Sequence, residues 1–260
     1  ACVSVGVDAI ERGHGPTRPD AAADRIGPRV DRERRELGRD ARHQLVAANI
    51  AVAEGELDAA VVHARRVKDI YDAVLAPDHL DRAEPDLLLG HIAFARMQLD
   101  EALVHYRSCL ATQRAALPPG HIEMALTLTN LGLVHLTRGE PDPAVDNLGE
   151  ALALLEAGEQ VNPEELRMAR HYLGDALLAR AGAGDSRRAA MQFETGFEGC
   201  SDAPLCARLA LRAARAHAQD GNSQAAASWA ERARPLYLAL DPETHGDSSA
   251  ALAEIETLLK

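Results

Sequence analysis

The sequence predicts an all-α solenoid of antiparallel helix pairs that ends in a C-terminal capping helix. The first observation is an internal period of 42 residues, which recurs along most of the 260-residue chain. The second is that apolar residues recur at three- and four-residue spacings within each period, as in amphipathic helices. The third is the composition, because aromatic residues make up only 3% of the chain and helix-favouring residues dominate it.

Each period contains a pair of packing residues in its predicted first helix. These pairs are Ala47-Ala48, Leu89-Gly90, Leu131-Gly132, Leu173-Gly174 and Ala213-Ala214. About seven residues later comes a turn residue, namely Gly55, Met97, Gly139, Gly182 or Gly221. The predicted second helix then carries a small residue and a packing residue four positions on, which are Ala60 and Ala64, Ala102 and Tyr106, Ala144 and Leu148, Ala189 and Phe193, and Ala226 and Ala230.

This spacing predicts two antiparallel helices in every unit. A glycine or alanine in the first helix leaves room for the second helix to approach closely. Glycine in the turn permits the backbone conformation that ends the first helix. We expect five units, at about 41–82, 83–124, 125–166, 167–206 and 207–240.

The two ends of the chain are interpreted separately. Residues 241–260 predict a capping helix, because Leu252, Ile255 and Leu259 fall on one helical face and an array needs its last apolar face covered. Two interpretations stay open for residues 1–40. They form either a degenerate sixth helix pair, with Gly13–Pro16 as its turn and 20–37 as its second helix, or a loosely attached tail.

The repeat resembles the tetratricopeptide repeat, and its 42-residue spacing is similar to the kinesin-light-chain subtype found in bacterial signalling proteins. The segment Leu126–Gly139 is the most specific match, and the resemblance covers about 41–240. The first and fifth units depart from the family pattern, because Ala-Ala replaces Leu-Gly there. The resemblance implies a right-handed superhelix whose concave face is lined by the first helices and binds a peptide.

The resemblance also assigns candidate residues to that groove by their position in each unit. The candidates are Asn49, His91, Phe94, Thr129, Asn130, Leu133, His171, Asp175 and Arg215. Polar anchors around an apolar middle suit an extended or helical peptide that inserts a few apolar side chains. The alternative is that some of these positions pack within the array. The basic set with which some family members grip a terminal carboxylate is absent, which argues against a chaperone-adaptor role.

Charge and composition exclude several classes of function. The net charge of −12 disfavours a nucleic-acid partner, because the summed field repels phosphates. The sequence has no run of about 18 apolar residues, so it predicts no membrane-spanning helix. The sequence contains no glycine-rich phosphate loop, nucleophile elbow or metalloprotease motif, so we expect no catalytic residues, no metal and no cofactor.

The four cysteines and eleven histidines predict structural roles. So few cysteines favour a reducing compartment, and we expect a cytoplasmic protein. Cys109 is expected in the core, whereas Cys200 and Cys206 are expected as a loop thiol and a buried thiol unless the compartment oxidises them. His79 and His121, 42 residues apart in equivalent loops, are expected to bond local backbone.

The sequence therefore predicts a non-catalytic scaffold that binds a protein or peptide. One alternative is the regulatory region of a larger signalling enzyme such as a bacterial protein kinase, favoured by a first residue other than methionine and by the unexplained segment 1–40. Another is a self-assembling module, a homo-oligomer whose partner is a second copy. A stand-alone enzyme is not expected.

Overall fold

The computed structural model describes residues 28–159, 161–241 and 248–260, with side chains described from residue 35 onward. This part of the chain contains eleven α-helices and no strand. The helices are α1 (Pro28–Glu54), α2 (Leu57–Val74), α3 (Ala83–Ala95), α4 (Leu99–Ala116), α5 (Met124–Thr137), α6 (Pro141–Ala157), α7 (Pro163–Arg180), α8 (Asp185–Phe197), α9 (Ala203–Gln219), α10 (Ser223–Leu238) and α12 (Ser249–Leu258). A short 3₁₀-helix, η2 (Leu80–Arg82), precedes α3.

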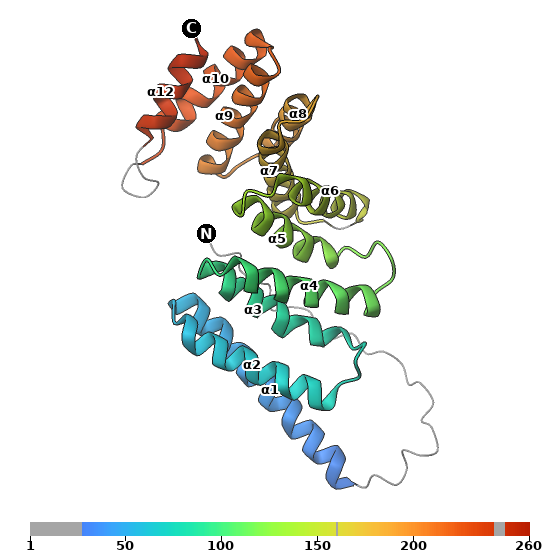
Figure 1. Cartoon of the computed structure of the whole chain (residues 1–260). Coiled ribbons are helices and arrows are strands. Elements are labelled where there is room, and N and C mark those ends of the chain that lie inside the picture. Colours follow the sequence, from blue (N-terminus) through green and yellow to red (C-terminus); the bar gives the residue numbers. More distant parts are fainter. Residues whose placement is uncertain (1–27, 160, 242–247) are drawn as a thin grey trace.

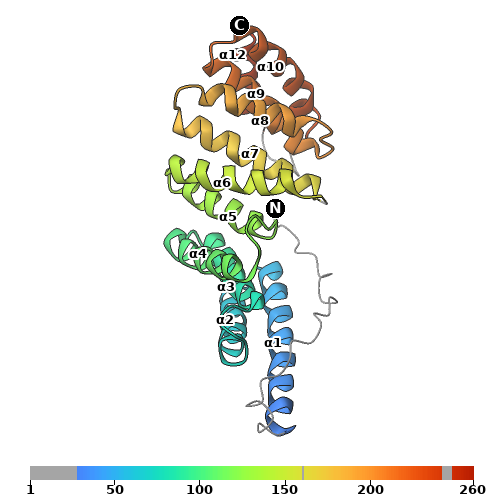
Figure 2. The ribbon, with the colours of Figure 1, turned by 90° about the vertical axis from the view of Figure 1, so that its right-hand side faces the viewer.

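The helices form pairs that stack along one axis (Figure 1). The pairs are α1 with α2, α3 with α4, α5 with α6, α7 with α8, and α9 with α10, and each second helix also packs on the first helix of the next pair. Turning the molecule by 90° shows the same order of pairs (Figure 2). The α12 helix packs on α10 and α9. The predicted all-α solenoid with a capping helix is confirmed.

The central three pairs are closed by a glycine that faces a large side chain. A Cβ atom at Gly90 would lie 2.6 Å from the Tyr106 ring, and one at Gly174 would lie 2.5 Å from Phe193. Gly132 stands in the same relation to Leu148, whose Cγ occupies the space of the missing Cβ. The glycine is therefore required by the close approach of the two helices.

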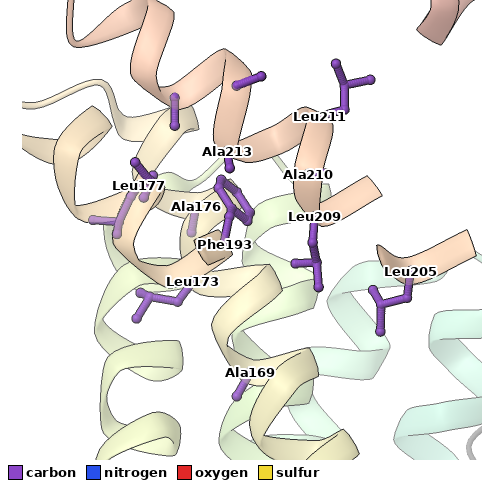
Figure 3. Packing of buried hydrophobic residues seen from close by; sticks show 14 of the residues in the cluster. Ala169, Leu173, Ala176, Leu177, Phe193, Leu205, Leu209, Ala210, Leu211 and Ala213 are labelled. Atoms are coloured by element: carbon purple, nitrogen blue, oxygen red, sulfur yellow. The ribbon is translucent and has the colours of Figure 1, made fainter. Parts of the chain in front are cut away.

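The first and last pairs solve the same packing problem with two small residues. Ala48 and Ala64 are both fully buried, as are Ala214 and Ala230. In these two helix pairs, two alanines replace the glycine and the large residue of the central pairs. The two helices therefore stay in contact without a large side chain between them. Around Phe193 the core includes Leu173 and other residues of α7 and α9 (Figure 3).

The turns inside the pairs use left-handed backbone. Gly55, Gly139 and Gly221 have φ values of 79°, 73° and 79°. In the fourth pair Gly182 lies in the connection between α7 and α8, as predicted, but the positive φ values fall at its neighbours Ala181 and Gly184, at 52° and 80°. The extra residues of this connection displace the turn, and the N–H of Gly182 instead donates to Asp185 Oδ2 at 2.9 Å.

Met97 occupies the turn position of the second pair with a φ of 59°, where a side chain is strained. Replacing Met97 by glycine is expected to raise the free energy of unfolding by about 1 kcal/mol, since the exposed side chain makes little contact. Urea denaturation measures it. Gly55→Ala, with open space around its Cβ position, is expected to change stability by a similar amount in the opposite direction. Equal stability of Met97→Gly and the parent would contradict this account.

The N-terminal prediction is corrected in part. The α1 helix runs without interruption from Pro28 to Glu54, so residues 28–37 are not the end of a separate second helix. No proline follows Pro28 within this stretch, and the single Gly38 is tolerated inside a helix at a modest cost. Residues 1–27, including the predicted turn Gly13–Pro16, lie outside the described residues.

The cysteines differ from expectation in one respect. Cys200 and Cys206 form a disulfide, so the expectation of two separate thiols is wrong. The loop after α8 brings Cys200 against the first turn of α9, and the structure thus has the oxidised alternative that the sequence left open. Disulfides are typical of oxidising compartments, which counts against the inference of a reducing compartment. Cys109 is a buried free thiol, as expected.

Candidate functional site

The candidate groove is the surface formed by the exposed sides of α1, α3, α5, α7 and α9, which we call the first-helix face. Asn49 is exposed on α1, and His91, Phe94, Thr129, Asn130 and Leu133 are half-buried on α3 and α5. On α7 and α9, His171 is buried whereas Asp175 and Arg215 are half-buried. The predicted residues thus extend along the array from its first pair to its fifth.

Three of the predicted polar residues bridge one first helix to the next, and a fourth bridges α9 to the capping helix. His91 Nε2 lies 3.0 Å from Asn130 Nδ2, joining α3 to α5. Asp175 Oδ1 lies 3.2 Å from Arg212 Nε, joining α7 to α9. Arg215 is bidentate to Glu254 of α12, at 2.7 and 2.5 Å. These side chains hold neighbouring helices together, so a ligand competes with existing partners for them.

His171 lies beneath the surface of the face. His171 is 7% exposed, and neither of its ring nitrogens forms a hydrogen bond within the described part of the chain. Burial lowers the pKa of His171 more than the nearby carboxylate of Asp175, 3.8 Å away, raises it. The ring contacts the Phe193 ring edge-on. A neutral imidazole of this kind is a packing residue.

Burial lowers the pKa of His91 to about 4, from an ordinary value of 6.5. The folded protein therefore stays unprotonated at His91 in a pH range where the unfolded chain takes up a proton. Stability is lost as the pH falls through this range, because the unfolded state binds more protons there.

Because of His91, we expect the free energy of unfolding to be about 2 kcal/mol lower at pH 5 than at pH 7. His91→Gln, which replaces the imidazole by an uncharged amide that can still hydrogen-bond to Asn130, is expected to remove that part of the pH dependence. Urea denaturation of both proteins at the two pH values measures it. The exposed His43→Gln serves as the control. The same pH dependence in His91→Gln and the parent would show that His91 is not the group responsible.

The middle of the face is apolar. Leu126 on α5 is 36% exposed, and Leu133, seven residues later, is half-buried. Among the described residues, neither belongs to the buried core clusters or packs on one. Between them, the Thr129 hydroxyl donates to the Ala125 carbonyl at 2.8 Å, so this hydroxyl is already satisfied by its own helix. We call Leu126, Thr129 and Leu133 the α5 strip.

Sequence reasoning missed an ion-pair ladder along the turns. Arg96 pairs with Asp58, and Arg138 pairs with Asp100, each across a junction between helix pairs. Arg187 and Asp220 form the same kind of pair with the charges reversed, at 3.2 Å. The signal was present, since the first two pairs repeat at 42 residues like the packing positions.

A buried network around Asp86 was also missed. The Asp86 carboxylate on α3 accepts from Lys68 of α2 at 2.8 Å and from Ser108 of α4 at 2.6 Å. His105 Nδ1 lies 3.1 Å from its other oxygen. Burial acts to raise the pKa of Asp86, but these hydrogen bonds outweigh burial and lower it. The network ties three helices together across the first junction.

Three further features that bear on function are metal sites, membrane-spanning helices and the loop histidines of the described residues. In the part of the chain that the structure describes, no group of three or more histidine, cysteine or acidic side chains is placed to hold a metal ion. Likewise, no helix among the described residues has the length and hydropathy needed to cross a membrane. His79 and His121 accept hydrogen bonds from backbone N–H groups two residues later, at 3.2 and 3.3 Å, as expected for loop histidines.

Comparison with known families identifies the repeat. The family model described as tetratricopeptide repeat matches residues 81–157, which span α3 to α6. This part of the chain belongs to the tetratricopeptide repeat family. Members of this family are typically non-catalytic repeat scaffolds. A comparison with curated protein sequences finds no match.

Solved structures extend the likeness over most of the chain. Kinesin-light-chain-like repeats from Podosopora anserina share 21% identity at a TM-score of 0.62, covering 79% of this chain and 96% of that one. BtubC from P. vanneervenii shares 18% identity at a TM-score of 0.65, covering 85% and 92%. YrrB, a tetratricopeptide repeat protein, shares 20% identity at a TM-score of 0.53, covering 73% and 82%. At these identities the likeness establishes the fold alone.

Proposed function

We propose that this protein is a non-catalytic scaffold that binds an extended or helical peptide on its first-helix face, centred on the α5 strip. The observation that carries the proposal is the pair Leu126 and Leu133. They are apolar, accessible and outside the packed core, on a helix whose other apolar positions are mostly buried. An apolar strip on a repeat scaffold is an ordinary site for a peptide that inserts side chains at regular spacing.

The surroundings of the strip form a partly apolar face in a fixed arrangement. Phe94 lies half-buried on the neighbouring α3, and the His91–Asn130 bridge holds α3 and α5 in a fixed relation. A preorganised face reduces the ordering cost of binding. YrrB is described as having an unusual peptide-binding site, which supports the class of ligand proposed here.

A peptide-display screen against the full chain tests the proposal. Leu133→Arg places a charge in the strip, and Val104→Arg places one at an apolar residue of α4 that is 64% exposed and lies outside this face. Peptides selected on the parent are expected to lose at least about tenfold in affinity on Leu133→Arg and to bind Val104→Arg normally. Circular dichroism confirms that both variants are folded. Peptides that bind Leu133→Arg as tightly as the parent would overturn the proposed location.

A further inference from the structure

An exposed ridge runs along α1. Arg42, Val46, Ile50 and Glu54 follow one another at four-residue spacing, and all four are exposed. Val46 and Ile50 are 56% and 51% exposed, which contrasts with the burial of the apolar residues on the other side of α1. We call these four residues the α1 ridge.

The repeat shows what an apolar residue at this position normally contacts. Ile50 lies two residues after the small-residue pair of its unit, and the corresponding residues of the later units are Ile92, Val134, Ala176 and Ala216. Their exposed fractions are 1%, 0%, 0% and 0%. Each lies in a core cluster that includes residues of the preceding helix pair. No helix pair precedes α1 within the described residues, so Ile50 is a stacking residue without its usual cover.

Glu54 indicates which charge a partner that covers the α1 ridge must carry. The corresponding residues Arg96 and Arg138 each pair with an aspartate of the preceding second helix, and Asp220 pairs with Arg187. This position therefore meets the opposite charge across three of the four junctions, whereas in the fourth unit Arg180 pairs with Asp185 of its own helix pair. Another unit of the usual sequence in front of α1 would set an aspartate against Glu54. The ridge instead requires a cation opposite Glu54.

The ridge itself supplies that cation. Arg42 lies at the other end of it, and neither Arg42 nor Glu54 forms an ion pair with another described residue. The ridge is symmetric about the midpoint between Val46 and Ile50, with opposite charges at equal distances from that point. A surface with this pattern is complementary to itself when one copy is turned end over end.

We propose that the α1 ridge is the contact surface of a symmetric dimer, in which α1 of one copy packs antiparallel on α1 of a second copy. Val46 then faces the partner's Ile50, and Arg42 faces the partner's Glu54, each contact occurring twice. Helices whose rows of residues four apart interdigitate cross at about −50°, the commonest packing class in globular proteins. The ridge is about 18 Å long at 1.5 Å per residue, so the dimer is weak, with a dissociation constant of about 1–100 µM.

Sedimentation equilibrium of the full chain at low salt, from about 1 µM to about 1 mM, tests the dimer. The mass is expected to rise from one chain to two. Ile50→Arg is expected to raise the dissociation constant at least about tenfold. Val104→Arg, at an exposed residue of α4, is the matched control and is expected to leave it unchanged. A chain that stays monomeric throughout, or a dimer that Ile50→Arg leaves intact, would overturn the proposal.

A charge exchange tests the antiparallel register. Arg42→Glu and Glu54→Arg singly place like charges opposite each other and are expected to weaken the dimer about tenfold each. The double variant restores both pairs and is expected to return to within about threefold of the parent. A double variant that is weaker than either single variant would exclude this register.

Photo-crosslinking identifies what covers the ridge. A benzophenone side chain at Val46 of the full chain is expected to react with α1 of a second copy and to double the mass on a denaturing gel. Reaction within the same chain, at residues 1–27, would show that the chain covers its own ridge and would contradict the dimer.

Discussion

Replacing Gly132 by valine is expected to lower the free energy of unfolding by at least about 3 kcal/mol. The Cβ atom would enter the space of Leu148 Cγ, and Leu148 is fully buried in the core cluster that joins α5 to α12. Because the branch point rather than the end of the leucine is blocked, a change of rotamer alone does not relieve the clash. Urea denaturation followed by circular dichroism measures the effect.

Gly149 provides the matched control for Gly132. It is also a helical glycine, on α6 next to Leu148, but nothing lies within 4 Å of its Cβ position. Gly149→Ala is expected to raise stability by about 0.5–1 kcal/mol through helix propensity. Gly132→Ala combined with Leu148→Ala recreates the pair seen at Ala48 and Ala64, and is expected to be more stable than Gly132→Ala alone. Equal effects of Gly132→Ala and Gly149→Ala would contradict the close approach of the helices at Gly132.

Removing the Asp86 carboxylate is expected to have the second-largest effect. Asp86 is 2% exposed and accepts hydrogen bonds from Lys68 and Ser108, with His105 also in contact. Asp86→Ala leaves these donors without an acceptor at the junction of three helices, which is expected to cost about 2–4 kcal/mol. Lys68 is partly exposed and regains water, so the lower part of the range is expected.

The exposed Asp69→Ala on α2 is the control for Asp86→Ala and is expected to change stability by less than about 0.5 kcal/mol. The contribution of Asp86 also depends on pH. Because its pKa is lowered in the folded state, its stabilisation is present above the pKa of the unfolded chain and is lost as the pH falls through the folded value. If Asp86→Ala and the parent have the same stability at pH 7, the network does not stabilise the junction.

The packing of the helix pairs could be predicted from sequence because it repeats. Gly132 and Leu148 recur as Gly90 and Tyr106 at the same spacing, so the period and the size of each residue together indicate a close approach. The ladder of Arg96 and Arg138 was equally predictable, since its two sides share the period.

The polar groups of the first-helix face were harder to predict. The bridge from His91 to Asn130 occurs once and has no counterpart of the same residue types in the next unit. The resemblance identified the helix positions but not whether a side chain faces solvent or the neighbouring helix. Arg215 was chosen as a ligand anchor, whereas the capping helix supplies Glu254 to it. The disulfide of Cys200 depends on the path of a loop, which has no period at all.

Peptide binding over the α5 strip can be observed residue by residue. The measurement is methyl-resolved NMR of the leucine-labelled full chain, titrated with a peptide from the display screen. The methyl signals of Leu126 and Leu133 are expected to shift first and furthest, with saturation at one peptide per chain. Shifts confined to leucines of α10 and α12, with Leu126 and Leu133 unchanged, would contradict it.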